Sequence, residues 1–319
     1  MNKMVSVIMP AYNRADMVGD SIESLLAQSY DNWELIITDS FSQDDTLKVC
    51  RNYAEKDSRI KVFSLDYSGV SAARNKCLDE AKGDYVFFLD SDDAIHPKLL
   101  EILVNALQDT GACIGGSGYC FVKNQKWSQV SNLIERSKEN ETTFLSFEDA
   151  ISAMFSYTTP INIMGGIMIS RELIGDTRFN TDLHIGEDFY FVYQNLVKGA
   201  DAIFLTECWY YARVHENNIS KDYSYEGFIS RFQRRELVWK SEESFGRKAN
   251  ADKQKRDALN VYRTYLLRNK PDTTDGRKIS KTIRSYRKEI LPALSFKDKL
   301  NFHITTIFPK IYHTLKHKK

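Results

Sequence analysis

The sequence predicts an α/β protein in which a mostly parallel sheet is flanked by helices and followed by a helical extension. The first 116 of the 319 residues alternate short apolar runs with stretches of helical periodicity, which is the pattern of strand-helix units around a parallel sheet. Beyond about residue 221 the strand signals stop and helical patterns take over. We therefore expect a main domain over residues 1–220 and a helical extension over residues 221–319.

Strands are expected where short apolar runs stand between polar segments. Residues 117–145 are polar and give the least regular pattern, and the glycine-rich stretch Gly115–Gly118 is interpreted as a turn. The last two strands are expected to form a pair. The expected strands are Val5–Pro10, Trp33–Thr38, Ile60–Ser64, Tyr85–Leu89, Ala112–Gly116, Gly166–Ser170, Ala202–Leu205 and Trp209–Val214.

Helices are expected where apolar residues recur every three or four positions. Asp16 is suited to cap the first helix, Pro97 to open the helix after the fourth strand, and Ser295 to cap a helix of the extension. Gly69 and Glu187 each precede or open a further helix. The apolar faces are Val18, Ile22, Leu25 and Leu26, then Leu99, Leu103 and Leu107, then Phe189, Val192, Tyr193 and Leu196, and finally Phe296, Leu300, Ile304 and Ile307.

The most specific feature is the apolar run Val86–Leu89, which leads directly into Asp90, Asp92 and Asp93. Adjacent carboxylates repel one another and resist desolvation, so this spacing favours a bound cation. Mg²⁺ and Mn²⁺ prefer carboxylate oxygens and are often shared with nucleotide phosphates. The alternative is a solvated acidic turn before the helix that begins near Pro97.

Polar residues follow three of the expected strands within a few positions. These residues are Asn13, Asp39 and the cluster Asp90–Asp93. In open sheets of this kind, ligands bind outside the carboxyl ends of the strands. The three loops are therefore expected to converge on one site.

Four segments, in this order, carry a resemblance to a known family. Val5–Asn13, Trp33–Thr46, Gly69–Asn75 and Phe87–Asp93 look like the successive signatures of family 2 glycosyltransferases with the GT-A fold. The resemblance implies inverting transfer of a sugar from a nucleoside-diphosphate donor, with Mn²⁺ or Mg²⁺ as cofactor. It also implies a nucleotide-binding half over residues 1–116 and an acceptor half over residues 117–220.

The resemblance implies donor contacts at each of these motifs. The family commonly has a second Asp where this chain has Ser40, which leaves the nucleobase open. An Asx turn is the alternative role for Asp39, and a surface ion pair is the alternative for Arg74. The implied nucleotide-sugar ligands are Pro10, Ala11, Tyr12, Asn13, Asp39, Arg74, Asn75 and Asp90, and the Asp-x-Asp pair Asp90 and Asp92 is the implied metal site.

Inverting transfer needs a base that takes the proton of the attacking hydroxyl. Glu187 and Asp188 open a predicted helix at the position of the family's Glu-Asp pair. Asp188 is the implied base, and Glu187 is expected to bind an acceptor hydroxyl or orient the site. Acidic capping of the helix is the alternative.

A further motif lies at the end of the main domain and contains Arg213, His215 and Ser220. Related enzymes often carry an Arg-x-His followed by Ser here, which makes His215 a candidate metal ligand and Arg213 a candidate diphosphate ligand. A lone His is otherwise an ordinary surface residue.

Charge is unevenly distributed along the chain. Residues 281–319 carry a net charge of +8 in a chain of net +1, so the remainder carries −7. A basic amphipathic tail suits an anionic membrane surface, and a packed helix with a solvated basic face is the alternative. Nucleic acid is disfavoured because aromatic residues are not interleaved with the basic run.

The location follows from other features of composition. The N-terminus lacks a signal-peptide pattern, no 18-residue apolar run is present, and the five cysteines are odd in number and scattered. A reducing, cytoplasmic location is expected, with peripheral binding at the inner face of the membrane.

These observations predict a metal-dependent inverting transferase. It would move a sugar, with UDP favoured as carrier, to a glycan or polyprenyl-linked hydroxyl in cell-surface polysaccharide synthesis. One alternative is a non-catalytic sugar-nucleotide-binding partner that activates another transferase. Another is a nucleotidyltransferase, but its glycine-rich and basic triphosphate loop is missing after the first strand, as are dinucleotide and P-loop fingerprints.

Overall fold

The computed structural model describes residues 3–123, 142–156, 164–214, 222, 224–268 and 273–307. The chain divides into two compact units. The sheet unit comprises Met1–Thr181 and Asp188–Asn218, and the helical unit comprises Ile219–Lys319 together with the short segment Asp182–Glu187.

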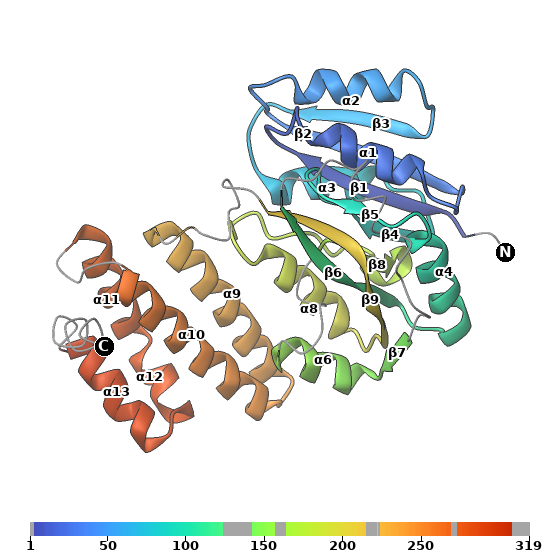
Figure 1. Cartoon of the computed structure of the whole chain (residues 1–319). Coiled ribbons are helices and arrows are strands. Elements are labelled where there is room, and N and C mark those ends of the chain that lie inside the picture. The colour runs from blue at the N-terminus through green and yellow to red at the C-terminus, as the bar shows by residue number, and fades with distance from the viewer. Residues whose placement is uncertain are drawn as a thin grey trace. The chain divides into compact units, whose positions relative to one another are not determined.

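The described part of the sheet unit is built on one nine-stranded sheet with the order β3-β2-β1-β4-β8-β6-β9-β5, and β7 pairs with β9. The pairs β1–β2, β2–β3 and β1–β4 are parallel, whereas β8 runs antiparallel between β4 and β6 (Figure 1). The carboxyl ends of β1, β2 and β4 therefore share one edge. The strands are β1 Val5–Ala11, β2 Trp33–Ser40, β3 Ile60–Leu65, β4 Tyr85–Phe88, β5 Ala94–Ile95, β6 Ile114–Lys123, β7 Thr142–Leu145, β8 Ile167–Ser170 and β9 Ala202–Val214.

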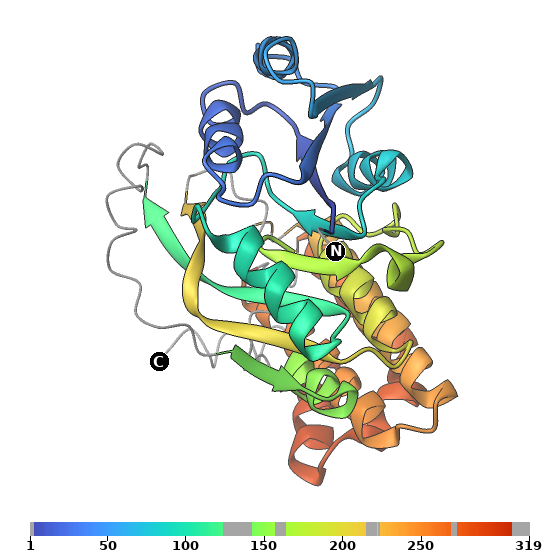
Figure 2. The ribbon, with the colours of Figure 1, turned by 90° about the vertical axis from the view of Figure 1, so that its right-hand side faces the viewer.

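Helices cover both faces of this sheet. Alternate residues of β1 and β2, such as Val7 and Leu35, pack with α1 and α4 in one buried core. On the opposite face, Cys77 of α3 donates to the carbonyl of Ile36 in β2. Figure 2 shows α1 and α3 on opposite sides of the strands. The helices of the unit are α1 Val18–Leu26, α2 Thr46–Ala54, α3 Val70–Glu80, α4 Leu99–Thr110, α6 Phe147–Ser156, α7 Arg171–Ile174 and α8 Glu187–Leu196.

The capping prediction for α1 is wrong. The helix begins after Met17, and no side chain caps it. The carbonyl of Arg14 accepts from the N–H groups of Met17 (2.9 Å) and Val18 (2.8 Å), so a backbone turn satisfies the donors that an Asp16 carboxylate would take.

The prediction of a turn at Gly115–Gly118 is also wrong, because these residues lie inside β6. A Cβ on Gly116 would stand 2.6 Å from the ring of Phe204, and one on Gly118 would stand 2.6 Å from the carbonyl of Glu207. The glycines therefore permit close approach of β9, with a register shift at Gly118. The two strands expected at Ala202–Leu205 and Trp209–Val214 are one continuous strand, β9.

A disulfide bond joins Cys120 of β6 to Cys208 of β9. This bond differs from the expectation that all five cysteines are reduced. The two residues are 88 positions apart in the sequence and are brought together by the pairing of β6 with β9, so their spacing gave no sign of the bond. Cys50, Cys77 and Cys113 are free.

The helical unit packs around a core of its own that includes Phe228, Trp239, Tyr262 and Phe302. The predicted Ser295 cap is confirmed, since its hydroxyl accepts from the N–H of Asp298 at 3.2 Å. Among the described residues, no helix is long and apolar enough to cross a membrane. The helices are α9 Tyr225–Ser244, α10 Lys248–Arg268, α11 Thr274–Ser285, α12 Arg287–Ile290 and α13 Phe296–Ile307, with a 3₁₀ turn at Leu291–Ala293.

Candidate active site

The loop after β1 is held against the loop after β2 by hydrogen bonds. Asn13 adopts a left-handed conformation with φ of 51°, which turns the chain out of the strand. Its N–H donates to Ser42 Oγ at 2.9 Å, and its side-chain oxygen accepts from the N–H of Gln43 at 2.8 Å. The Asn13 side chain thus fixes the two loops to each other, while the Tyr12 ring beside it is 46% exposed.

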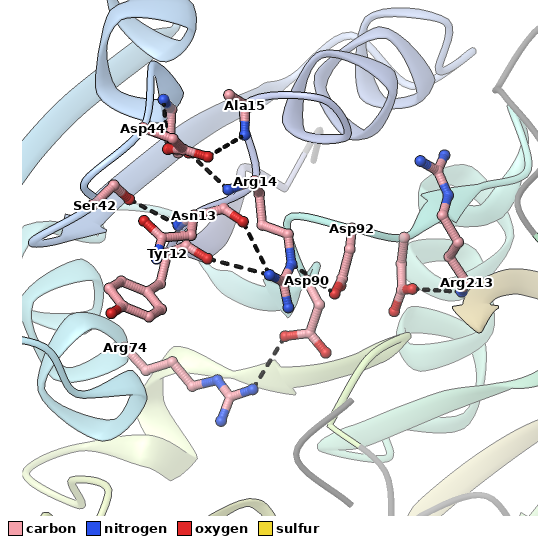
Figure 3. A network of polar contacts seen from close by, with 12 residues as sticks. Tyr12, Asn13, Arg14, Ala15, Ser42, Asp44, Arg74, Asp90, Asp92 and Arg213 are labelled. Atoms are coloured by element: carbon pink, nitrogen blue, oxygen red, sulfur yellow. Dashed lines mark hydrogen bonds and ion pairs between the residues drawn. The ribbon is translucent and has the colours of Figure 1, made fainter. Parts of the chain in front are cut away.

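Arg14 crosses from this loop to the acidic loop after β4 (Figure 3). Its Nε donates to Asp92 Oδ2 at 3.0 Å, and its Nη1 donates to the carbonyl of Asn13 at 3.0 Å. Its own N–H donates to Thr46 Oγ1 at 2.7 Å. An arginine of the β1 loop therefore neutralises the second carboxylate of the Asp-x-Asp pair.

Asp39 lies at the end of β2 and is 2% exposed. One carboxylate oxygen accepts from the N–H of Ser42 at 3.1 Å, which is the turn contact expected of an Asx residue. The other oxygen, Oδ1, is buried and has no hydrogen-bond partner in the described part of the chain. A buried carboxylate oxygen without a partner is costly and fits a ligand donor.

Ser40 follows Asp39 and holds the next loop. Its Oγ accepts from the N–H of Gly69 at 2.7 Å, directly before α3. The hydroxyl that replaces the family's second Asp therefore has a structural contact.

Arg74 and Asn75, one turn into α3, are both placed by Phe179. The guanidinium of Arg74 lies 5.3 Å from the centre of the Phe179 ring and donates to Asp90 Oδ1 at 3.1 Å. The Asn75 amide donates to the carbonyl of Phe179 (3.0 Å) and accepts from its N–H (2.7 Å). Asn75 thus fixes the segment against which Arg74 packs.

Asp93 turns inward and anchors the acidic loop to β9. Its carboxylate accepts from the Tyr210 hydroxyl at 2.7 Å and from the N–H of Arg213 at 2.8 Å. Burial, followed by the charges of Asp92 and Asp90, raises the pKa of Asp93 well above its usual range. The third carboxylate of the cluster is therefore a buried structural acid.

Asp188 lies near the Asp-x-Asp pair. Burial raises the pKa of Asp90, Arg74 lowers it, and the charges of Asp92 and Asp188 raise it. Asp188, at the start of α8, is thus close enough for its charge to raise the pKa of Asp90. Its own Oδ1 accepts from the N–H of Phe189 at 2.6 Å, and the neighbouring Glu187 is 8% exposed.

Of the motif Arg213, His215 and Ser220, only Arg213 lies among the described residues, and its side chain does not join this group. The guanidinium of Arg213 points to α1, where Nη2 donates to Asp20 Oδ2 at 2.9 Å, and only its backbone N–H reaches the acidic loop. His215 and Ser220 lie outside the described residues. Pro10 and Ala11, in contrast, form the end of β1 beside the Asn13 turn.

The residues present fit a divalent ion that is completed by its substrate. Within the described ranges, no group of three or more His, Cys, Asp or Glu residues forms a ready metal cage. Asp90 and Asp92 could supply two hard oxygen ligands, and Mg²⁺ is commonly held by one or two carboxylates plus substrate phosphates. Burial and the charges of Asp92 and Asp188 raise the pKa of Asp90, and a bound cation would offset the repulsion among these carboxylates.

Sequence reasoning missed the roles of Arg14, Phe179 and Tyr210. The signal for Arg14 was its position directly after the Asn13 turn, among loops expected to converge. Phe179 and Tyr210 belong to segments that are far from the acidic loop in sequence and carried no such signal.

Solved structures with this architecture define the class. Residues 1–349 of Staphylococcus aureus TarS, in a crystal structure with UDP-GlcNAc, superpose with a TM-score of 0.73 at 19% identity over 97% of this chain and 89% of that one. The mannosyltransferase PcManGT from Pyrobaculum calidifontis, solved with GDP-Man and Mn²⁺, superposes with a TM-score of 0.56 at 17% identity over 97% of this chain and 87% of that one. The fold is that of the GT-A glycosyltransferases.

Sequence comparisons then identify the family. Residues 6–177 match the model of glycosyl transferase family 2. The putative teichuronic acid biosynthesis glycosyltransferase TuaG of Bacillus subtilis is 32% identical over 69% of this chain and 82% of its own length. A cholesterol galactosyltransferase of Borreliella burgdorferi is 30% identical over 65% of this chain but 59% of its own length. The chain belongs to glycosyl transferase family 2 and is a glycosyltransferase.

Proposed function

We propose that the chain is a metal-dependent, inverting transferase that takes a sugar from a nucleoside diphosphate and places it on a hydroxyl of a glycan or lipid-linked acceptor. The observation that carries this proposal is the pairing of Asp90 with Arg74 and of Asp92 with Arg14 in one network (Figure 3). The charge of Asp188 acts on Asp90, and Asp39 ends β2 beside the end of β1. TuaG and TarS support a role in cell-surface polysaccharide synthesis and, through the UDP-GlcNAc of TarS, a UDP-sugar donor.

In this proposal the base and ribose lie along Pro10–Asn13, and the unpartnered oxygen of Asp39 accepts from the base. Arg74 has the fixed fork of donors that suits a phosphate or base edge, and Asn75 holds it in position through Phe179. Asp90 and Asp92 would hold Mn²⁺ or Mg²⁺. The ion would supply positive charge where the diphosphate leaving group becomes more negative.

Asp188 is the proposed base and Glu187 its neighbour at the acceptor. The carboxylate of Asp188 takes the proton of the acceptor hydroxyl while the acceptor oxygen bonds to the anomeric carbon and the nucleoside diphosphate leaves from the opposite side. A single displacement inverts an α-linked donor to a β linkage. Asp188 is the second residue of α8, where the helix dipole favours negative charge.

The first test separates donor binding from chemistry. UDP, GDP, CDP and dTDP sugars, each with Mn²⁺ or EDTA, are screened by thermal shift against the wild type and Asp92→Ala. One nucleotide should stabilise the wild type only with metal, and Asp92→Ala should lose that stabilisation. Stabilisation that is equal in EDTA would contradict metal dependence.

The second test addresses the base. With the donor found in the screen, Asp188→Asn should keep the nucleotide shift and lose about 10² to 10⁴-fold in turnover. Near-normal turnover of this variant would show that another group takes the proton. Glu187→Gln is expected to raise the acceptor KM more than it lowers kcat.

A second part of the proposal concerns location at the cytoplasmic face of a membrane. On α13, Phe296 is 86% exposed and Leu300, one turn further, is 55% exposed, with Lys297 and Lys299 beside them. Exposed apolar residues among lysines suit an anionic lipid surface. Vesicles containing anionic lipid should float the full chain more than a 1–280 truncation, and equal recovery would remove this role from the tail.

A further inference from the structure

We propose that Arg14 is a movable counter-ion of the donor site, which holds Asp92 while no donor is bound and turns to the diphosphate of the donor when a divalent ion takes the carboxylate. This inference rests on the proposed metal-dependent function. It assigns Arg14 a second partner, the diphosphate group, and predicts that metal and nucleotide bind together.

The backbone of Arg14 is fixed. Its N–H donates to Thr46 Oγ1 at 2.7 Å, and the N–H of Ala15 donates to Asp44 Oδ2 at 3.1 Å. The side chain extends from this anchor over the edge of the sheet to Asp92, as Figure 3 shows. Rotation about side-chain bonds alone can therefore redirect the guanidinium without any change in the loop.

The guanidinium of Arg14 has donor groups that make no hydrogen bond to the described residues, and it is partly exposed to solvent. Nε bonds to Asp92, and Nη1 bonds to the carbonyls of Asn13 and Tyr12, whereas Nη2 has no acceptor among the described residues. The side chain of Arg14 is 18% exposed and that of Asp92 is 20% exposed. Arg14 thus has donors left for a phosphate oxygen at the rim of the site.

Arg74 differs from Arg14 in ways that make it the fixed member of the pair. Its side chain is 7% exposed and lies against the Phe179 ring, a segment held by Asn75. In the described part of the chain, Arg14 has no aromatic ring beneath its guanidinium. Asp90 is therefore paired with an arginine whose side chain is fixed, Arg74. Asp92 is paired with Arg14, whose side chain can rotate away.

The charges require this exchange. A divalent ion at Asp92 would stand beside the positive charge of Arg14, and like charges at this distance repel. A diphosphate supplies negative charge that offsets both cations. The metal should therefore bind weakly to the free enzyme and more tightly with nucleotide, and by linkage the nucleotide should gain affinity from the metal by the same factor.

The experiment measures Mn²⁺ affinity of the full chain from the electron paramagnetic resonance signal of free Mn²⁺, with and without UDP. In the wild type UDP should tighten Mn²⁺ binding about tenfold or more. Arg14→Gln removes the competing charge, so it should bind Mn²⁺ alone about tenfold more tightly than the wild type and lose most of the effect of UDP. Arg59→Gln is the matched control, because Arg59 pairs with Asp57 just before β3, at the amino end of that strand.

The outcomes are distinguishable. Wild-type coupling with an unchanged Arg14→Gln would overturn the role of Arg14 and leave metal-dependent transfer intact. Failure of the wild type to bind Mn²⁺ even with UDP, in protein that UDP alone stabilises, would overturn both. Arg14→Lys keeps the charge and should bind Mn²⁺ alone as weakly as the wild type. If it bound as tightly as Arg14→Gln, charge competition would be the wrong explanation.

Discussion

Three neighbouring carboxylates at the end of β4 have three different environments. Asp90 is paired with Arg74, Asp92 is paired with Arg14, and Asp93 faces the interior. Their sequence spacing predicts a charged cluster, but only the tertiary neighbours decide which carboxylate can meet a ligand. The buried Asp93 is what holds the other two at the edge of the sheet.

Tyr210 is the residue on which this anchoring depends. Its hydroxyl donates to Asp93 Oδ2 at 2.7 Å and accepts from the N–H of Asp90 at 3.2 Å. Tyr210→Phe leaves the buried Asp93 carboxylate and the partly buried N–H of Asp90 without this partner, so we expect a loss of about 1–3 kcal/mol in the free energy of unfolding. We also expect weaker UDP and Mn²⁺ binding, because the acidic loop loses its anchor. Urea unfolding and the nucleotide thermal shift measure the two effects.

The neighbouring Tyr211 gives a matched control. It is 5% exposed in the same strand, and its hydroxyl makes no hydrogen bond within the described ranges. Tyr211→Phe should change neither stability nor ligand binding appreciably. Equal effects of the two substitutions would mean that ring packing, and not the Tyr210 hydroxyl, positions the loop.

At the candidate site, sequence predicts the residues that a short motif carries and misses those that another segment supplies. Asp39, Arg74, Asp90, Asp92 and Asp188 each stand in a local pattern of strand end or helix start. The pairing of Arg14 with Asp92 spans 78 residues and depends on how two loops pack. The catalytic and ligand roles of these residues stay predictions until they are measured.

At the level of elements, sequence predicts strands where a continuous apolar run is buried on both faces of the sheet, as in Tyr85–Phe88. It fails in β6, where a glycine-rich stretch looks like a turn, whereas Gly116 is required by the bulk of Phe204 and Gly118 by the backbone of β9. Local propensity describes the secondary structure that a segment prefers in isolation, whereas these glycines are required by close contacts with the neighbouring strand β9. The two-residue β5 is too short to show a pattern, and β7 was missed because most of its residues are exposed and it lacks a buried apolar run.

A polar cluster at the amino end of the sheet ties three elements together. Glu34 of β2 accepts from Ser6 of β1 (2.7 Å), from the N–H of Lys82 before β4 (2.8 Å) and from Lys61 of β3 (2.7 Å). Burial alone would raise the pKa of Glu34, but these hydrogen bonds and the Lys61 charge outweigh it, and the pKa lies below its ordinary value.

This lowered pKa predicts a pH-dependent contribution to stability. The ionised Glu34 stabilises the fold fully above its ordinary pKa of 4.5, and the contribution is lost as pH falls through the lower folded value. Glu34→Gln should therefore lower the free energy of unfolding by about 1–3 kcal/mol at pH 7. The difference in free energy of unfolding between this variant and the wild type should become smaller below about pH 4.5. Urea unfolding at several pH values tests this, with Glu80→Gln, from an exposed pair with Lys76, expected to cost under about 0.5 kcal/mol. A difference that does not vary with pH would contradict an ionic cause.

At the scale of the whole molecule, the division of the chain into two units falls directly before the proposed base. The segment Asp182–Glu187, which directly precedes Asp188, belongs to the helical unit. Ile185 is bonded to Ser230 of α9 through both its N–H (2.8 Å) and its carbonyl (3.1 Å). Gly186 has φ of +87°, and a Cβ there would stand 2.6 Å from the Arg234 side chain. The C-terminal helices therefore fix the backbone that leads into the proposed base.

Ser230→Ala tests whether this attachment serves catalysis. Loss of the buried Ser230 hydroxyl leaves the partly buried N–H and carbonyl of Ile185 without this partner and loosens the segment before Asp188. We expect turnover to fall about tenfold or more, because small displacements of a catalytic group are costly, while nucleotide stabilisation stays unchanged. Ser280→Ala is the control, since this serine is also buried in the helical unit but its hydroxyl has no partner among the described residues. Equal turnover in the two variants would mean that the helical unit stabilises the chain without positioning the base.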